Sequence, residues 1–376
     1  MSLLLLLIAH CIISTVSSNY FRTGDEYDEV KVSYLHVPSK HDAHHDVMIA
    51  VKQHNVEYLK HMLMQISDPT NEFYGQHMTR EEVGMITANK RSIHTISRYL
   101  RARGVHIVRQ SPYGEYITCR ASLELWENIF NTTFYRLNFL DRKKDDAKQY
   151  YRAKEYSIPF EIAPHVIDVF NTIQIPPENV LGNLHIRAHL SSKNSTDDDQ
   201  PTTITPAILN KYYDIDSNSG HSKVSQSLFE SLGQYYSDRD LHQFQDQYAI
   251  PRSDVALSLG MHESANFCLY VPYQCSEANL DVQYLMAISQ NTPTTMWYQP
   301  PIGDDIFLSW IESVSSNPTP PLVHSISYGA LERDLPISYA NAFNIEAIKL
   351  ALQGVTIVAS SGDDGVGNFR ARYPDC

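Results

Sequence analysis

The sequence predicts an α/β protein of two folded units, an α+β unit followed by a unit built on a parallel sheet. Three observations lead to this prediction. The 376 residues amount to about two and a half domains of ~150 residues. The composition, with 43% hydrophobic and 19% charged residues, is that of a folded globular protein. Charge also changes along the chain: residues 1–196 hold 22 Lys and Arg against 21 Asp and Glu, whereas residues 197–376 hold 8 against 22.

This charge distribution weighs against nucleic acid as a partner. The formal net charge is −13, and a nucleic-acid binder needs a basic surface that displaces counterions from phosphates. We therefore expect no nucleic-acid partner.

Residues 1–18 are typical of a secretory signal peptide, with a leucine-rich run and the small residues Ser17 and Ser18 at its end. The run lacks a preceding Lys or Arg, and a retained anchor is the alternative. A membrane span needs ~20 apolar residues, so we expect no stable span here or later. Sequons at Asn131 and Asn194 suit a glycoprotein of the secretory pathway, either lysosomal or extracellular.

Residues 45–175 show the alternating patterns of an α+β unit. Apolar residues at Val56, Leu59, Leu63 and Ile66 have helical spacing, and Gly104 ends a later helix. Helices packed on an antiparallel sheet predict a ferredoxin-like sandwich. The helices are expected over 55–66, 81–86, 91–103 and 123–130, and the strands over 47–51, 105–109, 116–120 and 133–140.

A polar stretch at 190–203 has no apolar period and predicts a linker between a first unit at 19–189 and a second at 204–376. The second unit opens with Thr205-Pro206, an N-cap followed by proline at the first helical position. Apolar strands without polar alternation predict a parallel sheet covered on both faces. Strands are expected over 223–230, 322–328 and 355–360, and helices over 207–213, 238–248, 282–289, 306–314 and 338–353.

Three carboxylates are candidate catalytic residues. Glu277 and Asp281 lie four residues apart at a helix start, so both side chains share one helix face. Paired carboxyl groups raise the pKa of one member, which can then act as a base in acid. Favourable negative charge at a helix N-terminus is the alternative explanation, and spacing alone favours it. Asp363 follows the last predicted strand, at the edge where parallel sheets bind ligands. Alone, it reads as an ordinary turn aspartate.

Four cysteines remain after the signal segment. Cys268 and Cys275 lie seven apart and could form a disulfide in an oxidising compartment, although two buried thiols are the alternative. Neither a CxxC pair nor an HExxH motif occurs, so no metal site is expected in this chain.

Several motifs together resemble the sedolisin, or serine-carboxyl, peptidases. Residues 277–285 resemble that family's Glu/Asp helix, residues 323–329 its substrate-flanking strand, and residues 359–365 its oxyanion turn, although Asp364 stands where serine is commoner. Residues 67–75 and 163–166 resemble its activation propeptide. The resemblance covers about residues 45–376 and implies a ferredoxin-like activation propeptide followed by a truncated, subtilisin-like parallel α/β sheet.

The resemblance implies acyl transfer on peptide or protein substrates in acid, with the propeptide as an intramolecular partner. Glu277 would be the general base, Asp281 would hold and tune it, and protonated Asp363 would stabilise the oxyanion. Ser327, Tyr328 and Gly329 would flank the substrate. Whether such an enzyme releases tripeptides or cuts internally stays open.

The family's nucleophile belongs to a Ser-Gly-Thr-Ser-type motif beyond the oxyanion turn, and its calcium site lies beyond that turn as well. The chain ends at Cys376 without this motif, so we expect it to be inactive alone and to hold no cofactor. The leading hypothesis is an incomplete acid peptidase zymogen. The alternative is a secreted, non-enzymatic inhibitor or binding protein that uses its propeptide-like half.

Histidines suggest an acid trigger in the first unit. Residues 19–196 contain twelve histidines against four in residues 197–376, and histidine titrates between neutral and acidic compartments. A histidine buried in its neutral form against the second unit would have to take up charge in acid, which would loosen the binding of the propeptide. Attraction between the more positive propeptide and the acidic second unit would instead tighten it, and solvated histidines would be silent.

Overall fold

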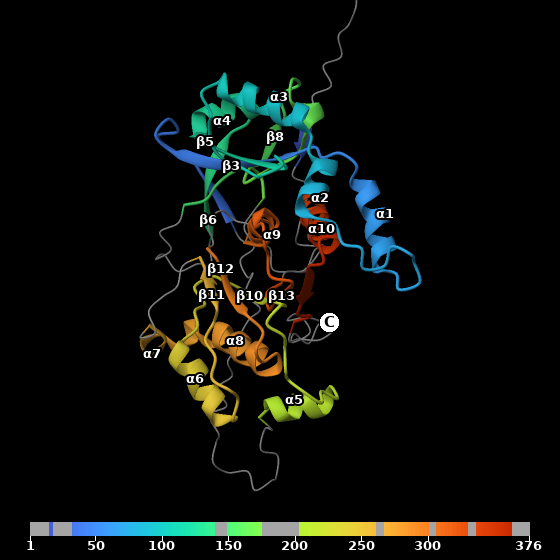
Figure 1. Cartoon of the computed structure of the whole chain (residues 1–376). Helices are drawn as coiled ribbons and strands as arrows, with labels where there is room; N and C mark the ends of the chain where they lie inside the picture. Colours follow the sequence, from blue (N-terminus) through green and yellow to red (C-terminus); the bar gives the residue numbers. More distant parts are fainter. Residues whose placement is uncertain are drawn as a thin grey trace, which may run out of the picture. The chain divides into compact units, whose positions relative to one another are not determined.

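A computed structural model describes residues 15–17, 32–139, 149–174, 203–260, 267–300, 306–329 and 336–362. Figure 1 shows the elements in sequence colours. The chain divides into two compact units. The first consists of residues 1–61, 81–177 and 333–342, and the second of residues 62–80, 178–332 and 343–376.

The first unit is built around a four-stranded antiparallel sheet in the order β4-β5-β3-β9. In chain order, the second strand pairs with the third, the third with the first, and the first with the fourth, which is the ferredoxin-like arrangement. The predicted α+β unit is therefore observed. These strands are β3 (His44–Val51), β4 (His106–Gln110), β5 (Tyr116–Ser122) and β9 (Val166–Phe170).

Helices connect these strands, and two of them, α3 and α4, begin after side-chain N-caps. The side chain of Asn89 accepts a hydrogen bond from Ser92 N–H, and Ser122 does the same for Leu125 N–H. The helices before and between the strands are α1 (Val56–Ser67), α2 (Arg80–Thr87), α3 (Lys90–Arg101) and α4 (Leu123–Phe130). Each lies within two residues of its predicted start.

Short strands flank this sandwich. A three-stranded sheet has the order β2-β6-β7, and a further antiparallel pair joins β1 and β8. Their bounds are β1 (Thr15–Ser17), β2 (Val32–Leu35), β6 (Phe134–Phe139), β7 (Tyr151–Ala153) and β8 (Glu155–Ser157), and a 3-10 turn covers Ala163–His165.

The core of the first unit is aromatic. Trp126 of α4 stacks on Phe130 at 5.3 Å between ring centroids, and Phe130 meets Tyr156 edge to face at 5.8 Å. The indole N–H of Trp126 donates to the backbone carbonyl of His45, 2.9 Å away, which ties α4 to the start of β3.

The second unit contains a five-stranded sheet in the order β11-β12-β10-β13-β14, and all four pairings are parallel. The predicted parallel α/β class is therefore correct. Two strands, β11 and β12, were not predicted. The strands are β10 (Gln226–Ser231), β11 (Leu257–Leu259), β12 (Thr294–Gln299), β13 (Val323–Ile326) and β14 (Thr356–Ala359).

Helices cover both faces of this sheet, because successive residues of β10 point to opposite sides. Leu228 packs in one cluster with α6 and α8, whereas the ring of Phe229 contacts Phe307 and Trp310 of α9. The helices are α5 (Pro206–Tyr212), α6 (Asp238–Gln247), α7 (Phe267–Tyr270), α8 (Ser276–Ile288), α9 (Ile306–Ser316) and α10 (Ile337–Leu352), with a 3-10 turn at Pro272–Gln274.

Two predicted segments lie mostly outside the described residues. The linker predicted at 190–203 lies outside them except for its last residue, and so does most of the segment 1–18. Among the helices that the structure describes, none is both long and apolar enough to cross a bilayer.

Candidate active site

Three carboxyl groups converge at the carboxyl edge of the parallel sheet. Glu230 is the penultimate residue of β10, and Glu277 and Asp281 lie one turn apart on α8. Glu277 is buried and Asp281 is half-buried. Ligands of open α/β sheets bind at this edge, so the structure brings two of the three predicted catalytic residues together where chemistry is expected.

Glu230 has no exposed surface. Burial raises the pKa of Glu230 well above its ordinary value, and the nearby charges of Asp281 and Glu277 raise it further. The hydroxyl of Tyr328 donates to Glu230 Oε2 at 2.7 Å, which opposes part of that rise. Burial and the neighbouring carboxylates therefore favour the neutral, protonated form of the Glu230 side chain.

The side chain of Asp281 interacts with that of Glu230. Burial raises the pKa of Asp281 to about 6, while hydrogen bonds from the side chains of Ser327 and Glu230 act in the opposite direction. The side chain of Asp281 therefore changes its charge within the mildly acidic range. A carboxyl group with such a pKa is typical of an acid–base site.

The three residues predicted to flank the substrate follow β13. Ser327 and Tyr328 point into the carboxyl cluster, through Asp281 and Glu230 respectively, and Gly329 is exposed at the end of the described segment. Asp363, the third predicted catalytic residue, lies just outside the described residues. The strand before it, β14, is tied to β13 by a hydrogen bond of 3.0 Å from Ser360 N–H to Ile326 C=O.

Sequence reasoning missed Glu230. Its signal is a carboxylate inside the apolar strand run Leu228-Phe229-Glu230. A buried acid in a strand that has helices on both faces needs a partner or a function. Only the fold shows that Glu230, which is 47 positions before Glu277 in the sequence, faces the same cluster.

The structure joins Cys268 and Cys275 in a disulfide, with Cα atoms 5.7 Å apart. Cys119 is a buried thiol, and burial raises its pKa to about 12. Asn131 is an exposed residue in the left-handed conformation that ends α4, and it is open to modification. Asn194 and Cys376 lie outside the described residues.

Within the described part of the chain, no group of three or more His, Cys, Asp or Glu side chains is arranged to hold a metal ion.

Comparisons with known proteins bear on both units. Residues 35–175 match the activation domain of pro-kumamolisin. Tripeptidyl-peptidase 1 of Pongo abelii is 28% identical over 343 residues, which cover 86% of this chain and 58% of the relative. Tripeptidyl-peptidase 1 of Homo sapiens is 28% identical over 350 residues, with the same coverage, and that of Dictyostelium discoideum is 26% identical over 355 residues. The chain thus spans less than two thirds of these relatives.

Among solved structures, a Pseudomonas sedolisin, a serine-carboxyl proteinase complexed with two molecules of pseudo-iodotyrostatin, matches with a TM-score of 0.35 and 19% identity. This match covers 46% of the present chain and 48% of that structure. The relationship predicted from the motifs rests on the activation-domain match and on the peptidase relatives.

Proposed function

We propose that the chain, which is similar to tripeptidyl-peptidase 1 and to the activation domain of pro-kumamolisin, is the precursor of a sedolisin-type serine-carboxyl peptidase that works in acid. The observation that carries the proposal is the cluster of Glu230, Glu277 and Asp281 at the carboxyl edge of the parallel sheet. Such a cluster can accept, hold and return a proton during acyl transfer.

In the proposed reaction, a serine hydroxyl attacks the carbonyl carbon of the scissile peptide bond. Glu277 accepts the hydroxyl proton and returns it to the leaving amine, and water then hydrolyses the acyl-enzyme with Glu277 as the base again. Asp363, in its protonated form, donates a hydrogen bond to the oxyanion. The family resemblance implies that this serine belongs to a Ser-Gly-Thr-Ser-type motif, which residues 1–376 do not contain.

Asp281 and Glu230 support Glu277 in this proposal. Below its pKa of about 6, Asp281 carries a proton that it can donate across one helical turn to Glu277. Glu230 in turn donates to Asp281. The pair orients the carboxyl group of Glu277, and the proposed place of action is an acidic compartment, either lysosomal or extracellular.

We assign residues 35–175 the role of an activation propeptide that keeps the precursor inactive, on the strength of their match to the activation domain of pro-kumamolisin. Peptide or protein substrates are the proposed ligands of the second unit. Calcium, which the family resemblance places beyond this chain, is proposed to bind outside residues 1–376.

The test is a peptidase assay on the longest natural product that contains residues 1–376. We expect acid pretreatment to produce hydrolysis of an unblocked peptide substrate, and Glu277→Gln to abolish it by at least ~10³-fold. Mass spectrometry of the products distinguishes release of tripeptides from internal cleavage. Secretion of a stable protein without hydrolysis at any pH would instead favour an inhibitor or binding protein.

A further inference from the structure

The first turn of α8, which carries Glu277, lacks a cap of its own. The N-cap residue is Cys275, and its side chain makes no capping hydrogen bond. The first backbone N–H groups of a helix have no partner within the helix. A general base on this turn would therefore sit on backbone that the helix itself does not fix.

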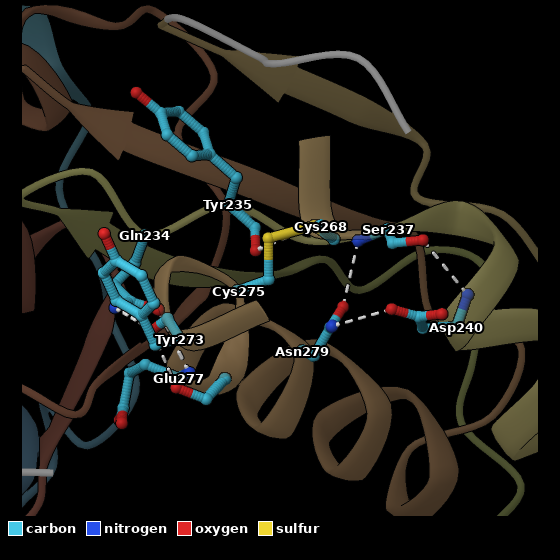
Figure 2. Close-up of a disulfide and its surroundings, with 10 residues drawn as sticks. Gln234, Tyr235, Ser237, Asp240, Cys268, Tyr273, Cys275, Glu277 and Asn279 are labelled. Carbon is cyan, nitrogen blue, oxygen red and sulfur yellow. Dashed lines mark hydrogen bonds between the residues drawn. A yellow bond between two sulfur atoms is a disulfide. The ribbon is translucent and has the colours of Figure 1, made fainter. Parts of the chain in front are cut away.

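Gln234 supplies the missing acceptor from another segment. Its side-chain oxygen accepts a hydrogen bond of 3.2 Å from the backbone N–H of Glu277, and its side-chain nitrogen donates one of 3.1 Å to the backbone carbonyl of Tyr273. Figure 2 shows the carboxamide between these two groups. Because one partner can only donate and the other can only accept, the orientation of the amide is fixed.

The conformation of the backbone before Gln234 sets the position of its side chain. After β10 ends, Leu232 and Gly233 both adopt the left-handed conformation, with φ of 55° and 80°. The N–H of Gly233 donates to the hydroxyl of Tyr298 at 3.0 Å, and Tyr235 N–H donates to the carbonyl of Gln274 at 2.8 Å. The turn that follows Glu230 thus leads directly to the contact with Glu277.

The disulfide anchors the other side of this contact. Cys275 is both the N-cap of α8 and half of the Cys268–Cys275 bond, so the loop that presents the Tyr273 carbonyl is covalently closed at the helix start. Around the bond, Tyr235 stacks on Tyr298 at 5.2 Å and meets Phe267 edge to face at 5.3 Å. The loop is therefore held by packing as well as by the covalent bond.

We propose that Gln234 is a positioning residue for Glu277, and that its carboxamide and the Cys268–Cys275 disulfide together restrain the first turn of α8. The inference rests on the proposed role of Glu277 as general base. Loss of the Gln234 hydrogen bonds or of the disulfide lets that turn move, and a displacement of ~1 Å at a reacting group can lower the rate by ~10²-fold. Reduction of the disulfide should act in the same direction as loss of the amide.

Asn279 provides a matched control on the same helix. Its side-chain oxygen accepts from Ser237 N–H at 2.9 Å and its nitrogen donates to Asp240 Oδ2 at 3.2 Å. It therefore joins α8 to the start of α6 with the same chemistry as Gln234. It is two residues from Glu277, which places it on a different face of the helix.

The first measurement is residue-resolved amide exchange of chain 1–376. We expect Gln234→Met, which keeps the length and removes both hydrogen bonds, to speed exchange at Glu277 N–H by at least ~10-fold. Treatment with a thiol reductant should also speed exchange there, and Asn279→Ala should leave it within ~2-fold. Unchanged exchange at Glu277 in Gln234→Met would overturn the inference.

The second measurement separates positioning from stability, in the longest natural product that contains this chain. Gln234→Met should lower kcat by at least ~10-fold with KM within ~2-fold, and Gln234→Glu should recover kcat only in acid, where its protonated carboxyl can both donate and accept. A change in KM alone would refute the positioning role. If the parent protein shows no hydrolysis, the proposed function fails, and the exchange data still decide whether Gln234 holds Glu277.

Discussion

His45 should make the first unit less stable in acid. Its ring lies at the start of β3, where Nε2 is 2.6 Å from the carbonyl oxygen of Asn171 and the ring centroid is 5.6 Å from that of Phe134. Burial, together with the positive charge of Arg152, lowers the pKa of His45 to about 4, against smaller opposing effects from Asn171 and Asp46. The folded state therefore resists protonation of this ring.

The magnitude follows from the two pKa values. An unfolded histidine titrates near ~6.5, so between that pH and about 4 the unfolded chain takes up a proton that the folded unit does not. Stability is thus fully present above pH ~6.5 and is lost as the pH falls. At pH ~4.5 the loss amounts to ~2.5 kcal/mol, and water at the exposed part of the ring reduces this value.

The variant that tests this is His45→Gln, which does not titrate and can still donate to Asn171. Unfolding of the full chain is measured at pH ~7.5 and pH ~4.5 by ¹⁹F resonances of fluorotryptophan, because Trp126 is the tryptophan of the first unit and Trp297 and Trp310 belong to the second. We expect the difference in unfolding free energy between the two pH values to shrink by ~2 kcal/mol. His41→Gln, at an exposed side chain, is the control. An equal pH dependence in the parent and in His45→Gln would refute the reasoning.

Three further predictions concern the second unit. Tyr328→Phe removes the hydroxyl that donates to buried Glu230, and denaturant unfolding should show a loss of ~1–3 kcal/mol; no loss would mean that Glu230 has another donor. His324 has no exposed surface and lies between the rings of Trp297 and Trp310, and burial lowers its pKa to about 4. His324→Leu should therefore make the second unit less sensitive to acid by ~2 kcal/mol between pH ~7.5 and ~4.5, and an unchanged pH profile would contradict this. At Gly260, with φ of +85°, a Cβ would lie 2.1 Å from the carbonyl oxygen of Tyr298, so Gly260→Ala should cost at least ~2 kcal/mol in thermal or denaturant unfolding, whereas neutral behaviour would show that β11 can move.

Most helices and strands could be predicted from the sequence, because caps and apolar spacing are properties of short stretches of the chain. The helices with clear caps, such as α3 after Asn89 and α4 after Ser122, begin within one residue of their predicted starts. The strand β12 was missed because Thr294–Gln299 carries polar residues at both ends, Thr294, Thr295 and Gln299, and so does not form the continuous apolar run that indicates a buried strand. Such a strand is recognised only when its neighbours in the sheet are known.

In the candidate site as well, local spacing predicts some of the arrangement and only the fold shows the rest. The spacing of Glu277 and Asp281 predicts their shared helix face, because four residues make about one turn. The contributions of Glu230, Gln234 and Tyr328 depend on which strand ends lie beside α8, and this pairing across the sheet is not encoded in any short stretch of sequence. Buried polar residues next to a sheet edge are the signal that could have indicated them.

The most direct test of the carboxyl cluster is the pH dependence of kcat/KM in the longest natural product that contains residues 1–376. With Asp281 at a pKa of about 6, the rate should fall above that pH as Asp281 loses its proton. Asp281→Asn stays neutral at every pH, so it should lower the maximal rate and also remove the decline near pH ~6. A decline at the same pH in Asp281→Asn would contradict the account, because the loss of activity would then have a cause outside the cluster of Glu230, Glu277 and Asp281.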